Sequence, residues 1–144
     1  MTKDKKMLIE ARGISKQFGG VEVLSNINLD LYVGEIHALL GENGAGKSTF
    51  AKILAGVHRP TRGQVTLNGK SVDVSSPIVA QKLGIALIHQ EPISFPDLSV
   101  AENIVMGRQV GGLLSRVPWP EIIDEARRYL DMLDVTIDVT RPMR

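Results

Sequence analysis

Apolar and polar residues alternate along VEVLSNINLDLY, residues 21–32, and this pattern predicts a half-buried β-strand. Five odd positions in it are apolar: Val21, Val23, Ile27, Leu29 and Leu31. We expect this strand to be antiparallel, with the preceding segment LIEARGI, residues 8–14, as the candidate partner. A second hairpin is predicted at Asn68-Gly69, because both residues tolerate a positive φ between two short strand-like runs.

Two shorter runs have a different pattern, because they are almost wholly apolar. They are IHALL, residues 36–40, and IALIH, residues 85–89. Strands covered on both faces have this composition, as in the parallel sheets of α/β proteins. We therefore predict two buried strands here.

Three helices are predicted from their end signals and periodicity. STFAKILAG ends at Gly56, and SPIVAQKLG has Ser76 as its cap, Pro77 in its first turn and Gly84 past its end. A third helix, near residues 120–133, has an apolar face. Its members are Ile122, Ile123, Ala126, Leu130 and Leu133. With the strands, these helices indicate an α/β fold.

Composition narrows the function classes. The 144 residues are 43% hydrophobic and 23% charged with a formal net charge of +1, as expected for one soluble globular domain. This balance does not favour a nucleic-acid partner. No apolar run approaches the roughly 18 residues of a membrane span, and no signal-peptide core follows the N-terminus, so we expect a cytosolic chain. The absence of cysteine excludes disulfides and thiolate metal sites.

The segment GENGAGKST, residues 41–49, follows the first apolar run and precedes a predicted helix. Its spacing fits the pattern G-x-x-x-x-G-K-[ST], in which glycines let several backbone N–H groups point into one concavity at a helix N-terminus. Such a nest suits a phosphate chain, and an ordinary glycine turn is the alternative. The candidate nucleotide-binding residues are Gly41, Asn43, Gly44, Ala45, Gly46, Lys47, Ser48 and Thr49.

The side chains of this loop have separate predicted roles. Lys47 would reach the β- and γ-phosphates as a point charge, which makes it a candidate catalytic residue. The Ser48 hydroxyl would complete the coordination of Mg²⁺, and Thr49 would donate to the α-phosphate. The residues alone therefore predict a phosphate chain with Mg²⁺.

The stretch LYVGEIHALLGENGAGKSTFAKILAGVHRPTRGQVTLNGK resembles the ATP-binding cassette (ABC) ATPases of membrane transporters continuously, and LLGENGAGKST matches their Walker A wording. The resemblance implies that the cofactors are ATP and Mg²⁺. In that family an aromatic residue upstream of the P-loop stacks on adenine. Phe18 in SKQFGGVEVL occupies that place, where an apolar ring gains from stacking and burial. The alternative is a phenylalanine of the core or of a hairpin edge.

The next match is IHQEPISFPDLSVAENI, in which the family's Q-loop glutamine would be Gln90. The resemblance implies that its amide contacts a metal-bound water, so Gln90 is a candidate catalytic and metal-site residue. Taken alone, Gln90 would be a polar surface residue. The flanking His89 and Glu91 do not form an acid–base pair in this interpretation, because a strand places neighbours on opposite faces. A histidine metal site is not favoured.

The family's Q-loop region also contacts membrane subunits, and here it would comprise residues 90–107. Pro92 and Pro96 stiffen the loop, while Phe95 and Leu98 are costly to leave in water. Ser99 then caps a short helix, in which Val100 and Ile104 lie one turn apart. The resemblance favours a groove that receives a short cytoplasmic helix of a membrane-spanning permease subunit. A loop that packs on its own domain is the alternative.

A finer resemblance carries an expectation about the solute. HALLGENGAGKST, IHQE and SVAENIVMGR are most similar to the first cassette of bacterial monosaccharide importers, which carry two cassettes in tandem. The implied solutes are sugars or sugar-like compounds such as pentoses and polyols. The implied partners are the permease subunits, a second cassette and, indirectly, a periplasmic solute-binding protein. The implied location is the cytoplasmic side of the inner membrane, as a peripheral protein.

Several family motifs do not occur in the 144 residues: the LSGGQ signature, the Walker B carboxylates and the switch histidine. Family comparison would place the signature just beyond TRPMR. We therefore predict an α/β P-loop NTPase cassette with an N-terminal antiparallel sheet, truncated before the Walker B half of the parallel core. About residues 7–110 would form the nucleotide-binding core and Q-loop, and about 111–144 the start of a helical subdomain. Exposed apolar faces and unpaired strand edges would follow.

Three other function classes stay open at this point. A non-transport cassette ATPase of repair or translation would differ in the partner of its Q-loop. A P-loop kinase for small molecules would need an acceptor site and a basic lid, and neither is visible. A nucleotide-binding fragment without turnover is the third, because the catalytic carboxylate does not occur in these residues.

Overall fold

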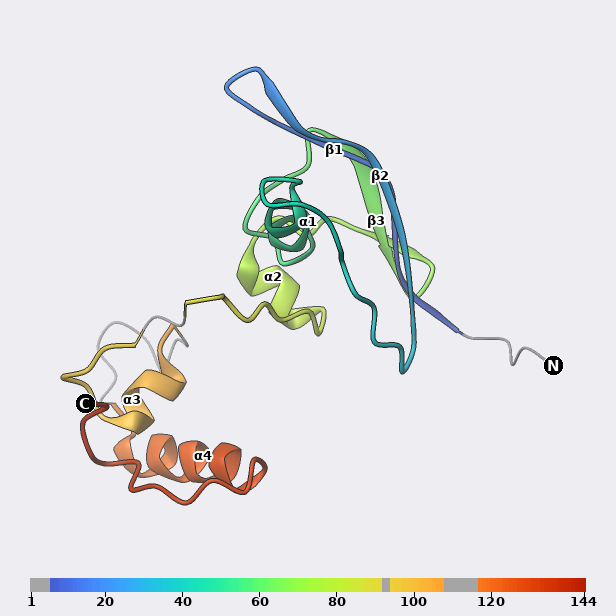
Figure 1. The fold of residues 1–144 in the computed structure, drawn as a ribbon. Helices are drawn as coiled ribbons and strands as arrows, with labels where there is room; N and C mark the ends of the chain where they lie inside the picture. Colours follow the sequence, from blue (N-terminus) through green and yellow to red (C-terminus); the bar gives the residue numbers. More distant parts are fainter. Residues whose placement is uncertain (1–5, 92–93, 108–116) are drawn as a thin grey trace. The chain divides into compact units, whose positions relative to one another are not determined.

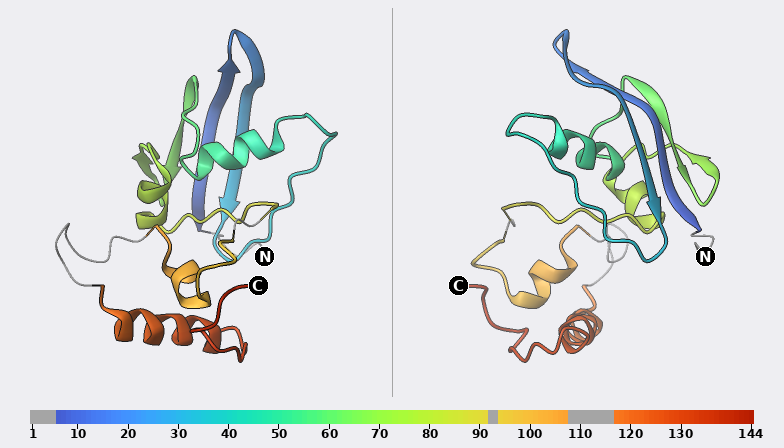
Figure 2. Two further views of the ribbon diagram at one scale, coloured as in Figure 1. Left: turned by 90° about the vertical axis from the view of Figure 1, so that its left-hand side faces the viewer. Right: turned by 45° about the vertical axis from the view of Figure 1, so that its right-hand side comes forward.

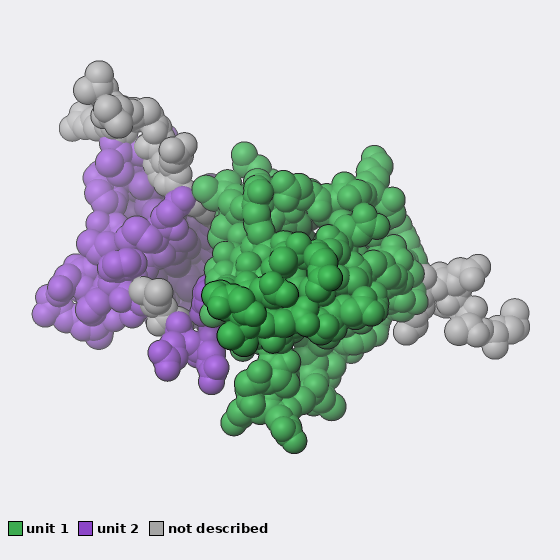
Figure 3. Space-filling view, turned by 90° about the horizontal axis from the view of Figure 1, so that it is seen from above, with its two compact units in different colours: residues 1–88 green, residues 89–144 purple. Residues whose placement is uncertain are grey.

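The computed structural model of the chain describes residues 6–91, 94–107 and 117–144. Its contacts divide the chain into two compact units, Met1–Ile88 and His89–Arg144, which are coloured separately in Figure 3. The predicted subdomain boundary near residue 111 lies outside the described residues.

The first unit contains a four-stranded antiparallel sheet in the order β2-β1-β3-β4. Figure 1 labels β1, β2 and β3 of this sheet. Its strands are β1 (Met7–Phe18), β2 (Val21–Tyr32), β3 (Arg62–Leu67) and β4 (Lys70–Val72). Both predicted hairpins are confirmed, since β1 pairs with β2 and β3 pairs with β4. Asn68 and Gly69 have φ values of 50° and 75°, which is the backbone that the turn between β3 and β4 requires.

The predicted alternation within β2 is wrong for the first part of the strand. Leu24, at an even position, is 4% exposed, whereas Val21 is largely exposed. The cause is a bulge at Asn26, whose φ of 50° accompanies a register shift between the pairs Ile14↔Ile27 and Lys16↔Leu24. The buried Ser15 hydroxyl accepts a hydrogen bond from the Asn26 N–H at 2.9 Å, which satisfies the bulged backbone.

Helix α1 (Lys47–Leu54) packs against the sheet, and Figures 1 and 2 show it beside the strands. Phe50 and Ile53 are its buried residues, and they join a core with residues of three strands. These residues are Ile9, Ala11, Ile14, Leu24 and Val65. Helix α2 (Pro77–Lys82) follows, and its predicted cap is confirmed, because the Ser76 hydroxyl accepts a hydrogen bond from the Val79 N–H at 3.3 Å.

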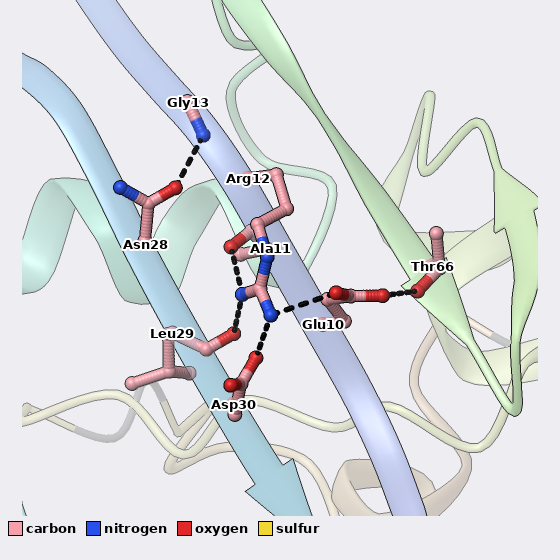
Figure 4. A network of polar contacts seen from close by, with 8 residues as sticks. All are labelled: Glu10, Ala11, Arg12, Gly13, Asn28, Leu29, Asp30 and Thr66. Carbon is pink, nitrogen blue, oxygen red and sulfur yellow. Dashed lines mark hydrogen bonds and ion pairs between the residues drawn. The ribbon is translucent and has the colours of Figure 1, made fainter.

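The polar face of the sheet is linked by Arg12, drawn in Figure 4. Its guanidinium forms ion pairs with Glu10 at 2.7 Å and Asp30 at 2.5 Å, and it donates to the Leu29 carbonyl at 3.3 Å. Thr66 donates to the other oxygen of Glu10 at 3.2 Å. Side chains from β2, β1 and β3 are thereby joined, and a network of this kind favours one strand register over its neighbours.

The two predicted buried strands at residues 36–40 and 85–89 are not strands in the described structure. Ile36, Leu40 and Ile88 are 100%, 91% and 94% exposed. A strand exists only through hydrogen bonds to a neighbour, and no described residue pairs with these segments. The expected exposure of apolar residues is confirmed. Leu39 and Leu40 also line an open hollow of about 150 Å³ beside α1.

The second unit contains α3 (Val100–Val105) and α4 (Trp119–Asp131). They share a small core with the segment after α4: Val100, Ala101, Val105, Ile122, Ala126 and Val139. The predicted third helix is confirmed, but its apolar face ends earlier than predicted, because α4 stops at Asp131 and Leu133 is largely exposed. The segment after α4 returns to α3, where the N–H groups of Val100 and Ala101 donate to the carbonyls of Arg141 and Val139.

Candidate nucleotide-binding site

The P-loop segment, residues 41–49, enters α1 after Gly46, the N-cap of the helix. Gly46 packs closely against Val23 and Leu24 of β2. Gly46 has a φ of 86°, a conformation that L side chains rarely adopt. A Cβ atom there would lie 2.5 Å from Leu24 Cδ2 and 3.0 Å from the Val23 carbonyl oxygen. Glycine is therefore needed at this position for its conformation and for its size, and it lets the loop approach the strand closely.

The first turn of α1 is left without a protein cap. Gly46, at the N-cap, offers no side chain, and the first turn contains no acidic residue. The first N–H groups of a helix have no intrahelical partner, and the helix dipole adds partial positive charge there. Ser48 is exposed in this turn and Thr49 is half-buried. The turn therefore presents N–H and O–H donors that suit an anionic ligand.

Lys47 crosses the mouth of the loop. Its ammonium donates to the Gly41 carbonyl at 2.8 Å and to the Glu42 carbonyl at 2.7 Å. These bonds hold the loop in a curled form around the start of α1. An ammonium has three donors, so one remains for a phosphate oxygen while the loop keeps its shape. Together with the uncapped helix, this arrangement fits the triphosphate of ATP, and the exposed Ser48 hydroxyl fits one ligand position of Mg²⁺.

Phe18 lies at the hairpin edge, where β1 ends, and its side chain is 41% exposed. Phe18 is therefore not a core residue, and its place at the hairpin edge leaves part of the ring accessible. The His58 ring meets the Phe18 ring edge to face, with centroids 5.1 Å apart and planes at 75°. The Lys16 ammonium lies over the Phe18 ring, 4.8 Å from its centroid.

Gln90 lies in an exposed bend of the second unit. The structure therefore groups Phe18 and residues 41–49 in one unit, whereas Gln90 belongs to the other. Among the described residues, no group of three or more His, Asp or Glu side chains is arranged to hold a metal ion.

The part of the Q-loop region that is described is held by Asn103, which the sequence did not single out. Its amide oxygen accepts from the Phe95 N–H at 2.8 Å. Its amide nitrogen shares two hydrogens among the carbonyls of Phe95 at 3.0 Å, Leu98 at 3.3 Å and Ser99 at 2.9 Å. Phe95 is exposed and Leu98 is half-buried on this fixed loop. Pro92 lies outside the described residues. Four hydrogen bonds to one amide give the loop a defined shape.

The predicted cap of α3 is confirmed and is a full capping box. The Glu102 N–H donates to the Ser99 hydroxyl at 3.2 Å, while the Glu102 carboxylate accepts from the Ser99 hydroxyl at 2.6 Å and from the Ser99 N–H at 2.7 Å. These two hydrogen bonds, that of the hydroxyl first, lower the pKa of Glu102 below its ordinary value.

This combination of a curled glycine loop, a lysine across it and an uncapped helix defines a P-loop. The profile of the ABC transporter family matches residues 24–139, and the chain therefore belongs to that family. Its curated relatives include the ribose import ATP-binding protein RbsA 1 of Streptomyces coelicolor, 49% identical over 137 residues. A putative ribose/galactose/methyl galactoside import ATP-binding protein of Agrobacterium fabrum is 43% identical over 143 residues.

These relatives are longer than the chain. The alignments cover 95% and 98% of the chain but only 27% and 28% of the Streptomyces and Agrobacterium proteins. Among solved structures, a nucleotide-free ATP-binding cassette from an ABC transporter superposes with a TM-score of 0.80 at 23% identity. That match covers 95% of this chain and 58% of the cassette, so it shows a shared fold over about half of a cassette.

The predicted α/β cassette with an N-terminal antiparallel sheet is thus confirmed. Within the described residues, no helix is long and apolar enough to cross a bilayer.

Proposed function

We propose that this chain forms the ATP-binding part of an energy-coupling subunit in a bacterial importer for sugars or sugar-like solutes. The observation that carries the proposal is the P-loop geometry, in which Lys47 bridges the Gly41 and Glu42 carbonyls beside an uncapped helix N-terminus. Membership of the ABC transporter family supports ATP as the ligand. The names of the relatives, which include ribose import ATP-binding proteins, support the solute class.

In this proposal the residues of the loop divide the work of binding. The N–H groups from Gly44 to Thr49 surround the β-phosphate, and the Lys47 ammonium contacts the β- and γ-phosphates. The Ser48 hydroxyl holds Mg²⁺, which neutralises charge on the phosphates when it is bound. Phe18 stacks on adenine. Gln90 is assigned to the water near the γ-phosphate, and phosphoryl transfer then depends on placement and charge stabilisation.

We assign the loop of residues 94–99 as the part of the Q-loop region that meets the membrane-spanning permease subunits. Asn103 holds this loop in shape while Phe95 stays exposed, so an apolar surface is presented on a rigid support. A second cassette and a periplasmic solute-binding protein complete the proposed complex, with the chain at the cytoplasmic side of the inner membrane. No nucleic acid takes part.

The proposal for the P-loop is tested by Lys47→Ala in the full chain. Removing charge-assisted hydrogen bonds of this kind costs about 1.5–3 kcal/mol, so the affinity for Mg-ATP should fall roughly 10- to 150-fold. Lys52→Ala, on the last turn of the same helix, is the matched control and should bind like the parent. Titration calorimetry measures both. Equal affinity of the Lys47→Ala variant and the parent would remove the P-loop from the function.

The proposal for the partner is tested by changing Phe95 and Leu98 to Ser in the full chain, produced together with its membrane subunits. Co-purification and solute uptake should fall while the affinity for Mg-ATP stays near that of the parent. Tyr129→Ser on α4 serves as a control for a general loss of apolar surface. Normal assembly and uptake in the folded double variant would favour a non-transport cassette ATPase instead.

A further inference from the structure

Phe18 is an exposed ring at the end of a strand, and two side chains restrict it. His58 meets it edge to face at 5.1 Å between centroids, and the Lys16 ammonium lies over it at 4.8 Å. His58 comes from the loop after α1, forty positions further along the chain. Without these contacts an exposed phenylalanine at a strand end would sample several rotamers. Ordering such a side chain when a ligand binds costs entropy, so a ring that is already restricted binds its ligand more tightly.

Lys16 is bonded to the loop of residues 57–61, and His58 is part of that loop. The Lys16 ammonium donates to the Arg59 carbonyl at 2.7 Å. The main-chain N–H of His58 donates to the Lys52 carbonyl, in the last turn of α1, at 3.3 Å. The main chain is joined as well, since the Thr61 N–H donates to the Ser15 carbonyl at 2.8 Å.

A second hydrogen bond joins the main chain next to Phe18 to this loop. The Gln17 N–H, next to Phe18, donates to the Thr61 hydroxyl at 3.0 Å. Helix α1 then links the loop of residues 57–61 to the P-loop, and its eight residues span roughly 12 Å. The end of β1 is therefore connected, through the loop of residues 57–61 and α1, to the P-loop.

We propose that His58 and Lys16 are positioning residues, which hold the Phe18 ring as a preformed platform for the base of the nucleotide. The inference rests on the proposed function, in which Phe18 stacks on adenine. The edge-to-face contact with His58 restricts rotation of the Phe18 ring. The Lys16 ammonium lies over one face of that ring in a cation–π interaction. The base then stacks on the exposed part of the ring, since Phe18 is 41% exposed. Neither residue contacts the phosphates in this arrangement.

The test separates the base from the phosphates. The full chain is titrated with Mg-ATP and with Mg-tripolyphosphate, which has the phosphates and no base. His58→Ala should weaken Mg-ATP binding about two- to tenfold, as expected for loss of an aromatic pair, while Mg-tripolyphosphate binding stays within twofold. Lys16→Met keeps the apolar stem without the charge and should weaken Mg-ATP binding about two- to fivefold, again with tripolyphosphate unaffected.

Two variants act as controls. His58→Phe restores a ring in the same place and should bind Mg-ATP within twofold of the parent, which a loss of folding would not allow. Arg59→Ala changes the neighbouring side chain, whose partner is Asp73, and leaves the carbonyl that Lys16 uses, so it should bind both ligands like the parent. Phe18→Ala should reproduce the selective loss of Mg-ATP binding.

The outcomes distinguish this inference from the function on which it rests. If Phe18→Ala weakens Mg-ATP binding but His58→Ala and Lys16→Met do not, Phe18 contacts the base as proposed, and the role of His58 and Lys16 in positioning its ring is wrong. An equal loss of Mg-ATP and tripolyphosphate in His58→Ala would place its effect on the phosphate loop and overturn the inference. Unchanged binding in both Lys47→Ala and Phe18→Ala would overturn the proposed function itself.

Discussion

Gly46→Ala tests whether close packing of the P-loop on β2 stabilises the first unit. Gly44 provides a matched comparison, because it has the same φ of 86° and a Cβ atom there would meet nothing within 4 Å. Gly44→Ala therefore carries the backbone strain alone, which is about 1–2 kcal/mol for an L residue in the left-handed region. Gly46→Ala carries the same strain together with a steric term.

The steric term follows from the two contacts of the added methyl group. Leu24 Cδ2, at 2.5 Å, belongs to a side chain buried in the core, and the Val23 carbonyl, at 3.0 Å, is main chain. Overpacking of this kind costs about 1–3 kcal/mol. The free energy of unfolding should therefore fall by about 2–5 kcal/mol in Gly46→Ala, and the difference between the two variants should be about 1–3 kcal/mol.

Urea unfolding of the full chain, without nucleotide and followed by circular dichroism, gives both free energies. Combining Gly46→Ala with Leu24→Ala should recover part of the steric cost, so the double-mutant cycle should show a favourable coupling. If Gly44→Ala and Gly46→Ala destabilise the chain equally, the loop is not packed against β2 in the way the structure shows.

Three further predictions concern the 144-residue chain on its own. It should not release phosphate from ATP at about 1 per second, the low end of typical enzyme rates; phosphate release at that rate, lost in Lys47→Ala, would contradict this. It should bind an apolar dye, and Ile36→Ser with Leu40→Ser should lower the fluorescence; an undiminished signal in the folded variant would assign the dye elsewhere. Ser99→Ala should destabilise it by about 1 kcal/mol at pH 7, measured by urea unfolding. Because the folded pKa of Glu102 is lowered, the contribution of its carboxylate bonds is full above the ordinary glutamate pKa and is lost as the pH falls through the lowered value. The difference between the variant and the parent should therefore shrink in acid to the part that comes from the Glu102 N–H bond to the Ser99 hydroxyl, which does not titrate.

Local signals in the sequence were sufficient for the elements whose partners lie nearby. The turn at Asn68-Gly69 and the cap at Ser76 depend on residues within a few positions, and the structure has both. The bulge at Asn26 was not predictable in this way, because a single extra residue reverses the alternation that the pattern relies on. The pattern therefore placed Leu24 on the exposed face of β2, whereas the structure buries it.

The apolar runs at residues 36–40 and 85–89 failed for another reason. An apolar composition indicates that a segment is suited to a buried strand. It does not show that neighbouring strands are present to pair with that segment. At the candidate site, the sequence motif of residues 41–49 identified the P-loop, because the groups that donate hydrogen bonds to a phosphate are consecutive in the chain. The contact of Phe18 with His58 joins residues forty positions apart, and no local pattern announces such a pair.

The order of strands in the first sheet has a consequence for how the unit folds. β1 pairs with β2 across a two-residue turn, but its other neighbour, β3, begins only at Arg62. The segment between β2 and β3, residues 33–61, contains both the P-loop and α1. Closing a loop of this length costs roughly 3 kcal/mol of chain entropy. We expect the β1–β2 hairpin to form first and the β1–β3 pairing to come late, so that the P-loop takes its shape only when the slowest contact of the sheet has been made.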